Sequence, residues 1–277
     1  MSVYRTLARP GLVTPARALQ RPAWPYACNW DSPQADGLVA WWPALPWGGG
    51  MHDRCHGLFE ATTVGGAPSQ VSEPEYDVVQ SFDGTDDNYA VPNAQTVGLQ
   101  LAHLGPVSAF AWALHRTLSG TNEPVAFFGG QYWVCRFTSG TTGDAGPFGR
   151  NANITGLATN TWQHLGFTWT YSGSGSGTNQ TYRDGLANSS ATGTTTAAGT
   201  VEDFTIGRRV SFGFFDGLVA DVRVYDRALS PAVVWQLWDP STRWDLYYPL
   251  RQRVFVDMGA AAESSELLFA RQHLSLP

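Results

Sequence analysis

The 277-residue sequence contains no lysine, and all 17 of its basic residues are arginine. The absence of lysine excludes P-loop ATPases and Schiff-base enzymes, because both depend on a lysine amine. Charge is sparse, at 14% of residues, and the net charge is −6. A negative balance argues against a nucleic-acid-binding surface, so we expect no nucleic acid among the partners.

Cysteine is also scarce. The sequence has three cysteines, Cys28, Cys55 and Cys135. An odd number of cysteines without a C-x-x-C pair indicates neither a disulfide framework nor a zinc site. We expect free thiols, with a Cys28–Cys55 bridge as the alternative.

No run of roughly 18 apolar residues is present, so we expect no membrane-spanning helix. Residues 1–26 lack the apolar segment of a secretory signal, so no signal peptide is expected.

What the sequence does have is 30 glycines, 12 tryptophans and many short apolar runs. These runs are divided by Gly, Thr, Ser and Asn, which predicts an all-β fold. Residues 107–115 and 162–170 are predicted strands, and residues 124–128 and 131–138 a hairpin. In the first of these strands Phe110, Trp112 and Leu114 alternate with three alanines, so its two faces should differ in bulk.

Residues 215–230 predict a long strand followed by a short helix. We expect Leu218, Ala220, Val222 and Val224 on one face of the strand, and Val219, Asp221, Arg223 and Tyr225 on the other. Ser230 is a predicted helix cap, and Pro231 suits the first helical position because its missing N–H is not needed there. The strand should end a sheet, and the helix should close it.

The composition suggests three parts. Residues 1–36 form an Arg- and Pro-rich extended arm, residues 37–240 a β-sandwich domain, and residues 241–277 a tail that is a predicted assembly contact. The predicted partner-binding residues are Arg5, Arg9, Arg17, Arg21, Trp24, Trp244, Tyr247, Tyr248, Leu267, Leu268 and Phe269. The alternative is that the arm and the tail pack on their own domain.

Several motifs occur in the order typical of one family. They include Gly37-Leu-Val-Ala-Trp-Trp-Pro43, Phe82-Asp-Gly-Thr-Asp-Asp87, Trp162-Gln-His164, Arg183-Asp-Gly185 and the 215–230 stretch. Together they resemble the laminin G-like branch of the concanavalin A-like lectin/glucanase jelly rolls. Ala220 departs from this pattern, since the family usually has Asp there. The resemblance implies a two-sheet antiparallel jelly-roll sandwich with one short C-terminal helix and extended terminal tails.

The family is mostly non-catalytic, and residues 238–247 are similar to tails on such domains in phage structural proteins. The leading hypothesis is therefore a non-enzymatic virion component, such as a capsid decoration protein. It would bind other capsid subunits through its arms, form homo-oligomers and be assembled in the host cytoplasm. The first alternative is a lectin-like carbohydrate-binding module that binds glycans, and the remote alternative is a glycoside hydrolase.

Candidate site residues are few. Related glycosidases use Glu-x-Asp-x-x-Glu, and the nearest match, Glu75-Tyr-Asp77-Val-Val-Gln80, has a glutamine at the proton-donor position. Trp41, Trp47 and Trp133 are candidates for stacking on sugars, with burial in the core as the alternative. Asp86 and Asp87 are weak candidates for Ca²⁺, which binds several oxygens; otherwise no cofactor is expected. The His52–His56 segment has ligand-like residues but is interpreted as a turn.

Overall fold

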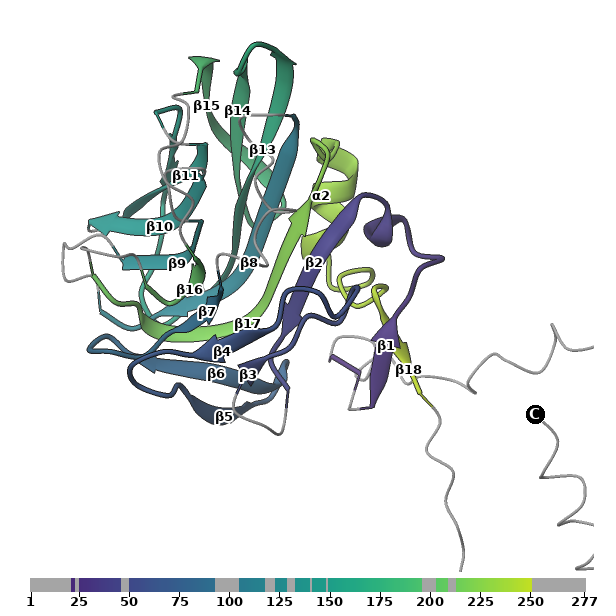
Figure 1. Ribbon diagram of the computed structural model, residues 1–277, viewed down its shortest axis with the longest axis vertical. Coiled ribbons are helices and arrows are strands. Elements are labelled where there is room, and N and C mark those ends of the chain that lie inside the picture. The colour runs from purple at the N-terminus through teal and green to yellow at the C-terminus, as the bar shows by residue number, and fades with distance from the viewer. Residues whose placement is uncertain are drawn as a thin grey trace, which may run out of the picture.

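The structure is a computed structural model that describes residues 21–22, 25–45, 50–92, 105–117, 123–128, 133–139, 141–147, 149–195, 203–208 and 213–250. Two antiparallel sheets pack face to face, which confirms the predicted β-sandwich (Figure 1). Within these residues, no helix has the length and apolarity needed to span a bilayer.

The first sheet has the order β15 (Leu186–Thr194), β14 (Ser176–Arg183), β13 (Trp162–Gly173), β8 (Val107–His115), β17 (Asp216–Tyr225), β6 (Asp77–Asp83) and β5 (Ser69–Glu73), and β2 (Leu38–Pro43) also pairs with β17. The second has the order β12 (Ala152–Thr155), β11 (Thr142–Pro147), β10 (Trp133–Ser139), β9 (Glu123–Phe128), β16 (Phe204–Ile206), β7 (Tyr89–Val91), β4 (Ala61–Thr63) and β3 (Gly50–Met51). The predicted hairpin corresponds to β9 and β10, which pair.

The main core lies between the two sheets. The three alanines of β8 face it, together with Leu165, Phe167 and Trp169 of β13. Phe110 and Trp112 of β8 face the opposite way, into a second cluster on the outer side of the first sheet. The predicted division of β8 into a small and a bulky face is therefore confirmed.

The prediction for β17 was wrong in two respects. The strand lies inside the first sheet, between β8 and β6, and does not end it. Its faces also differ from those predicted. Val219, Val222 and Val224 face the main core, whereas Leu218 and Ala220 lie in the outer cluster. The pairing of β17 with β8 shifts register between Val219 and Asp221. This irregularity behaves as a β-bulge, which inserts one residue and reverses the faces that follow it.

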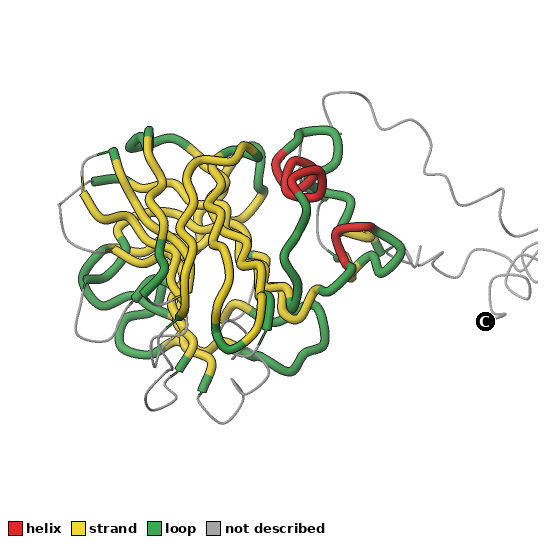
Figure 2. The backbone as a smooth tube through the Cα atoms, turned by 90° about the horizontal axis from the view of Figure 1, so that it is seen from above, coloured by secondary structure: helices red, strands yellow, loops and turns green. Residues whose placement is uncertain are grey.

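An outer layer of chain covers the first sheet. It contains β1 (Tyr26–Cys28) paired with β18 (Tyr247–Pro249), the 3-10 helix η2 (Pro33–Ala35) and the helix α2 (Pro231–Trp238). Figure 2 shows both helices on this one side of the sandwich. Ser230 caps α2, as predicted, and its side chain accepts a hydrogen bond from the Val233 N–H. Pro231 lies in the first turn of the helix, also as predicted. Residues assigned to the arm and the tail thus pair with each other and pack on the sandwich.

The strand β15 forms from a segment rich in Ser, Thr, Ala and Gly. Cys28, Cys55 and Cys135 are separate thiols, and burial raises the pKa of Cys28 to about 11.

Candidate functional site

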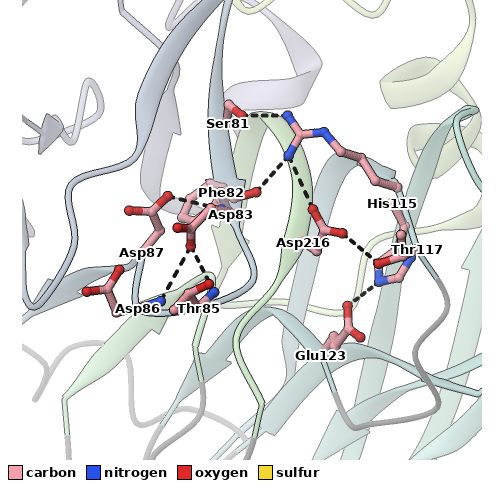
Figure 3. Close-up of polar contacts among 11 residues, drawn as sticks. Ser81, Phe82, Asp83, Thr85, Asp86, Asp87, His115, Thr117, Glu123 and Asp216 are labelled. Carbon is pink, nitrogen blue, oxygen red and sulfur yellow. Dashed lines mark hydrogen bonds and ion pairs between the residues drawn. The ribbon is translucent and has the colours of Figure 1, made fainter.

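Acidic side chains gather at one end of the sandwich, where β6 ends and β17 begins. Asp83 and Asp216 lie directly opposite each other on these paired strands. Asp86 and Asp87 follow Asp83 in the turn towards β7. One carboxylate oxygen from each of Asp83, Asp86 and Asp87 lies within 4.8 Å of those from the other two (Figure 3). We call Asp83, Asp86, Asp87, Asp216 and the neighbouring Arg116 the acidic rim.

The turn that carries these acids is held by its own side chains. Asp83 accepts hydrogen bonds from the N–H groups of Thr85 at 2.8 Å and Asp86 at 3.4 Å. Asp87 accepts from the Asp83 N–H at 3.0 Å. The Asp87 side chain is only 8% exposed, and burial raises its pKa above the usual range. Asp83 and Asp86 are exposed, so their carboxylates are open to a ligand.

Gly66 closes the other side of this turn. A Cβ at this position would lie 2.2 Å from an Asp86 carboxylate oxygen and 2.7 Å from one of Asp87. The Gly66 N–H donates to the Asp86 carbonyl at 3.1 Å. Glycine is therefore required here for space, because any side chain would displace the acids.

Arg116 partly balances the negative charge. Its guanidinium donates to the Phe82 carbonyl at 2.8 Å and to Asp216 at 3.3 Å. Asp216 also accepts from the Thr117 hydroxyl at 2.6 Å. The rim has four carboxylates and one guanidinium, so its local charge is negative. Such a surface can bind a cation or accept hydrogen bonds from hydroxyl groups.

Beneath the rim, Nε2 of His115 lies in hydrogen-bond contact with the Glu123 carboxylate, which is shown in the same view (Figure 3). Both side chains are buried, and the imidazole stacks on Phe137 with ring centroids 4.5 Å apart. Neither residue is open to a ligand. This pair therefore joins β8 to β9 below the surface that carries the acids.

The sequence identified only part of this site. Asp86 and Asp87, the predicted calcium candidates, do lie together. Asp83 was missed although it belongs to the same Phe-Asp-Gly-x-Asp-Asp motif. Asp216 and Arg116 could not be found from spacing, since they come from strands far apart in the chain.

The predicted sugar-stacking tryptophans are not available as a group. Trp41 is fully buried, and its indole N–H donates to Asp221 at 3.0 Å, so it belongs to the core. Trp47 lies outside the described residues, and Trp133 is in β10, where the structure does not describe its side chain. Among the tryptophans that the structure describes, the exposed indoles are those of Trp30, 52% exposed and stacked on His56, and Trp235, 40% exposed.

Most of the predicted partner-binding residues lie outside the described part of the chain: Arg5, Arg9, Arg17, Trp24, Leu267, Leu268 and Phe269. Of the others, Arg21, Trp244 and Tyr247 are at most 7% exposed and pack on the sandwich. Arg21 donates to the Val78 carbonyl at 2.7 Å. Only Tyr248, at 55%, remains exposed among those described.

The other predicted motifs have structural roles. Gln80 is fully buried and accepts from the Tyr89 hydroxyl at 2.9 Å. Asp53 accepts from the N–H groups of Trp41 and Cys55, so the His52–His56 segment is a turn, as interpreted.

Comparison with known proteins identifies the class of fold. Residues 83–234, more than half of the chain, match the sequence model of the laminin G-like concanavalin A-like lectin/glucanases superfamily. The chain belongs to this family. No curated protein matches.

Solved structures show the same fold at low identity. A mutant Trypanosoma rangeli sialidase with trans-sialidase activity is 17% identical, with a TM-score of 0.57 over 76% of this chain and 33% of the sialidase. Domain 4 of AbnA, a GH43 extracellular arabinanase from Geobacillus stearothermophilus solved with arabinotriose, is also 17% identical. Its TM-score is 0.53, over 73% of this chain and 98% of that domain. The chain thus spans about a third of the sialidases and nearly all of the arabinanase domain.

These findings contradict the predicted phage structural role. The similar structures include carbohydrate-active enzymes, and none of the comparisons supports a virion component. The burial of Arg21, Trp244 and Tyr247 also removes three of the contacts on which that role depended.

Proposed function

We propose that this domain is a carbohydrate-binding module with no catalytic activity of its own. The observation that carries the proposal is the likeness to the arabinanase domain. That domain was solved with a bound arabinotriose, and the shared fold extends over 98% of its length. Membership of a lectin/glucanase family supports the same function. The sialidases are similar over only a third of their length, as expected for one module of a larger enzyme.

The acidic rim is the surface that we assign to the glycan. Sugars present several hydroxyl groups, and ionised carboxylates accept hydrogen bonds from them strongly. Asp83 and Asp86 are exposed, and two backbone N–H groups of the turn hold the Asp83 carboxylate in position. Prior fixation of binding groups reduces the entropy lost on binding.

Calcium is the cofactor that this surface would suit. Calcium binds six to eight oxygen ligands, often from carboxylates. Asp83, Asp86 and Asp87 would hold the ion, because each offers a carboxylate oxygen within 4.8 Å of those of the other two. A bound cation would also add an attractive charge for sugar hydroxyl groups.

A glycan array followed by calorimetry tests the proposal. Arabinotriose and sialic acid are the first probes, each titrated in calcium chloride and in EDTA. We expect selective binding, weakened about tenfold or more by Asp83→Asn or Asp86→Asn. Asp31→Asn, an exposed acid elsewhere on the surface, is the matched control. Trp30→Ala tests whether the exposed indole contributes a stacking surface. Absence of binding across the array, or turnover of any glycan, would contradict the proposal.

A further inference from the structure

A shallow cavity of about 160 Å³ lies across one end of β13, β14 and β15, which are neighbours in the first sheet (Figure 1). It begins just beyond the point where Trp169 of β13 pairs with Val107, the first residue of β8. The acidic rim lies at the other end of β8, where His115 pairs with Gly217. The cavity and the rim are therefore at opposite ends of the same sheet.

Hydroxyl groups form the walls of the cavity. Thr170, Thr178 and Thr192 pair directly across the three strands and make one row, and Ser176 lies two residues from Thr178 in a second row. Directly paired residues share a face of the sheet, and neighbours along a strand face opposite ways. Since Trp169 faces the main core, Thr170 and its row face outward. The walls therefore stand on the outer face of the first sheet.

The floor between the two rows is backbone. Gly177 pairs with Tyr171 and Gly193 in the row between the walls. A Cβ on Gly177 would lie 2.7 Å from the Trp169 ring, so this row faces the core and leaves only main chain outside. Arg150 is also on the core side, since a Cβ on Gly193 would lie 2.4 Å from its Nε. The described residues that line the cavity carry no charge.

Hydrogen bonds within each row hold the hydroxyl groups in place. The Thr178 and Thr192 hydroxyls are bonded at 3.1 Å, and those of Ser176 and Thr194 at 2.8 Å. The Thr170 hydroxyl donates to the Thr178 carbonyl at 3.1 Å. A bonded pair of hydroxyls uses one of its two hydrogens, so the other hydrogen and several lone pairs can still bind a ligand. Side chains that are already held lose less entropy when a ligand binds.

We infer that this cavity is a second glycan-binding site, which takes one ring of a neutral sugar. Hydroxyls that both donate and accept match the hydroxyl groups of a sugar. An acidic sugar would find no guanidinium or amine for its carboxylate, and an apolar ligand would leave the hydroxyls without partners. Sites for drug-sized ligands have volumes of about 300–1,000 Å³, so this cavity suits a smaller group. The inference goes beyond the proposed function and does not depend on the acidic rim.

The test is an NMR titration of the full chain labelled with nitrogen-15, with arabinotriose and xylotriose as neutral probes. We expect the amide signals of residues 170–178 and 192–194 to shift, with a dissociation constant on the order of 1 mM because one ring makes few contacts. These shifts should be the same in calcium chloride, in EDTA and in Asp83→Asn. Sialic acid should leave the signals of the cavity in place. Thr178→Val and Thr192→Val keep the side-chain shape but remove a hydroxyl, so each should weaken binding about threefold to tenfold. Thr62→Val, at an exposed threonine of β4, is the matched control.

The same spectra separate this inference from the proposed function. Shifts confined to the acidic rim would overturn the second site and leave the proposed function standing. Shifts at the cavity with none at the rim would support the second site and contradict the assignment of the glycan to the rim. The second site would also be overturned if neither neutral probe moved the cavity signals, if both valine variants bound as the wild type does, or if Asp83→Asn abolished the shifts.

Discussion

The buried carboxylate of Asp221 accepts the indole N–H of Trp41 at 3.0 Å. Its other oxygen accepts from Arg223 at 2.7 Å and from the Tyr247 hydroxyl at 2.9 Å. Three segments far apart in the sequence, β2, β17 and β18, therefore meet at one side chain. This network attaches the outer layer of chain to the first sheet.

Replacing Asp221 by alanine should destabilise the domain strongly. Arg223 is only 3% exposed, so it would be left as an unpaired buried charge. Breaking such a pair costs about 3–5 kcal/mol. The free energy of unfolding in urea measures the effect. Asp36→Ala, which breaks the exposed pair with Arg227, is the control and should cost at most about 1 kcal/mol. Equal effects of the two variants would contradict the role of the network.

The core position of Trp41 gives a second prediction. Trp41→Phe keeps an aromatic ring but removes the donor to Asp221, so it should cost about 1–3 kcal/mol of unfolding free energy. Glycan binding measured by calorimetry should not change. Trp30→Phe, at a half-exposed position, should alter stability by less than about 0.5 kcal/mol. Loss of glycan binding without loss of stability in Trp41→Phe would instead favour the sugar-stacking hypothesis.

How far the sequence predicted this fold is clearest in β17. Alternation located the strand and its length, because side chains in a strand reverse face at each residue. It assigned Val222 and Val224 to the face of Leu218, whereas the structure puts them on the opposite face. The cause is the register shift after Val219, which depends on pairing with β8 and leaves no mark in local composition.

The site was predicted less completely than the fold, for a related reason. Asp86 and Asp87 are neighbours in sequence, so a motif could bring them to attention. Asp216 reaches the same rim only because β17 pairs with β6. The arginines and aromatic residues of the arm and tail have the composition of a partner-binding surface, but composition cannot tell an external partner from the chain's own sandwich.

The close approach of Gly66 to the acidic rim gives a third prediction. Gly66→Ala should displace Asp86 and Asp87, since its Cβ would come within 2.7 Å of both carboxylates. We expect weaker glycan or calcium binding in calorimetry, while the thermal midpoint changes little. Gly105→Ala is the matched control, because a Cβ there meets nothing within 4 Å. Unchanged binding by Gly66→Ala would argue that the rim is not the site.

The last prediction concerns the dependence of stability on pH. His164 is 2% exposed, and burial lowers its pKa from 6.5 to about 3, with Arg223 and Arg243 adding to the effect. The folded state therefore keeps the imidazole neutral where the unfolded chain binds a proton. The contribution of the neutral His164 to the free energy of unfolding is fully present above about pH 6.5. It is lost as the pH falls from 6.5 towards 3, by up to about 1.4 kcal/mol per pH unit.

His164→Phe should lower the slope of the unfolding free energy against pH by the contribution of about one bound proton, because phenylalanine does not titrate. The substitution keeps an aromatic ring beside Phe110. The measurement is the free energy of unfolding in urea at several pH values between about 4.5 and 7.5. His56→Phe, at an exposed histidine, is the control for exchanging an imidazole for a phenyl ring. If His164→Phe and the wild type lose stability equally as the pH falls, the imidazole is protonated without unfolding, and His164 does not control the acid sensitivity of the domain.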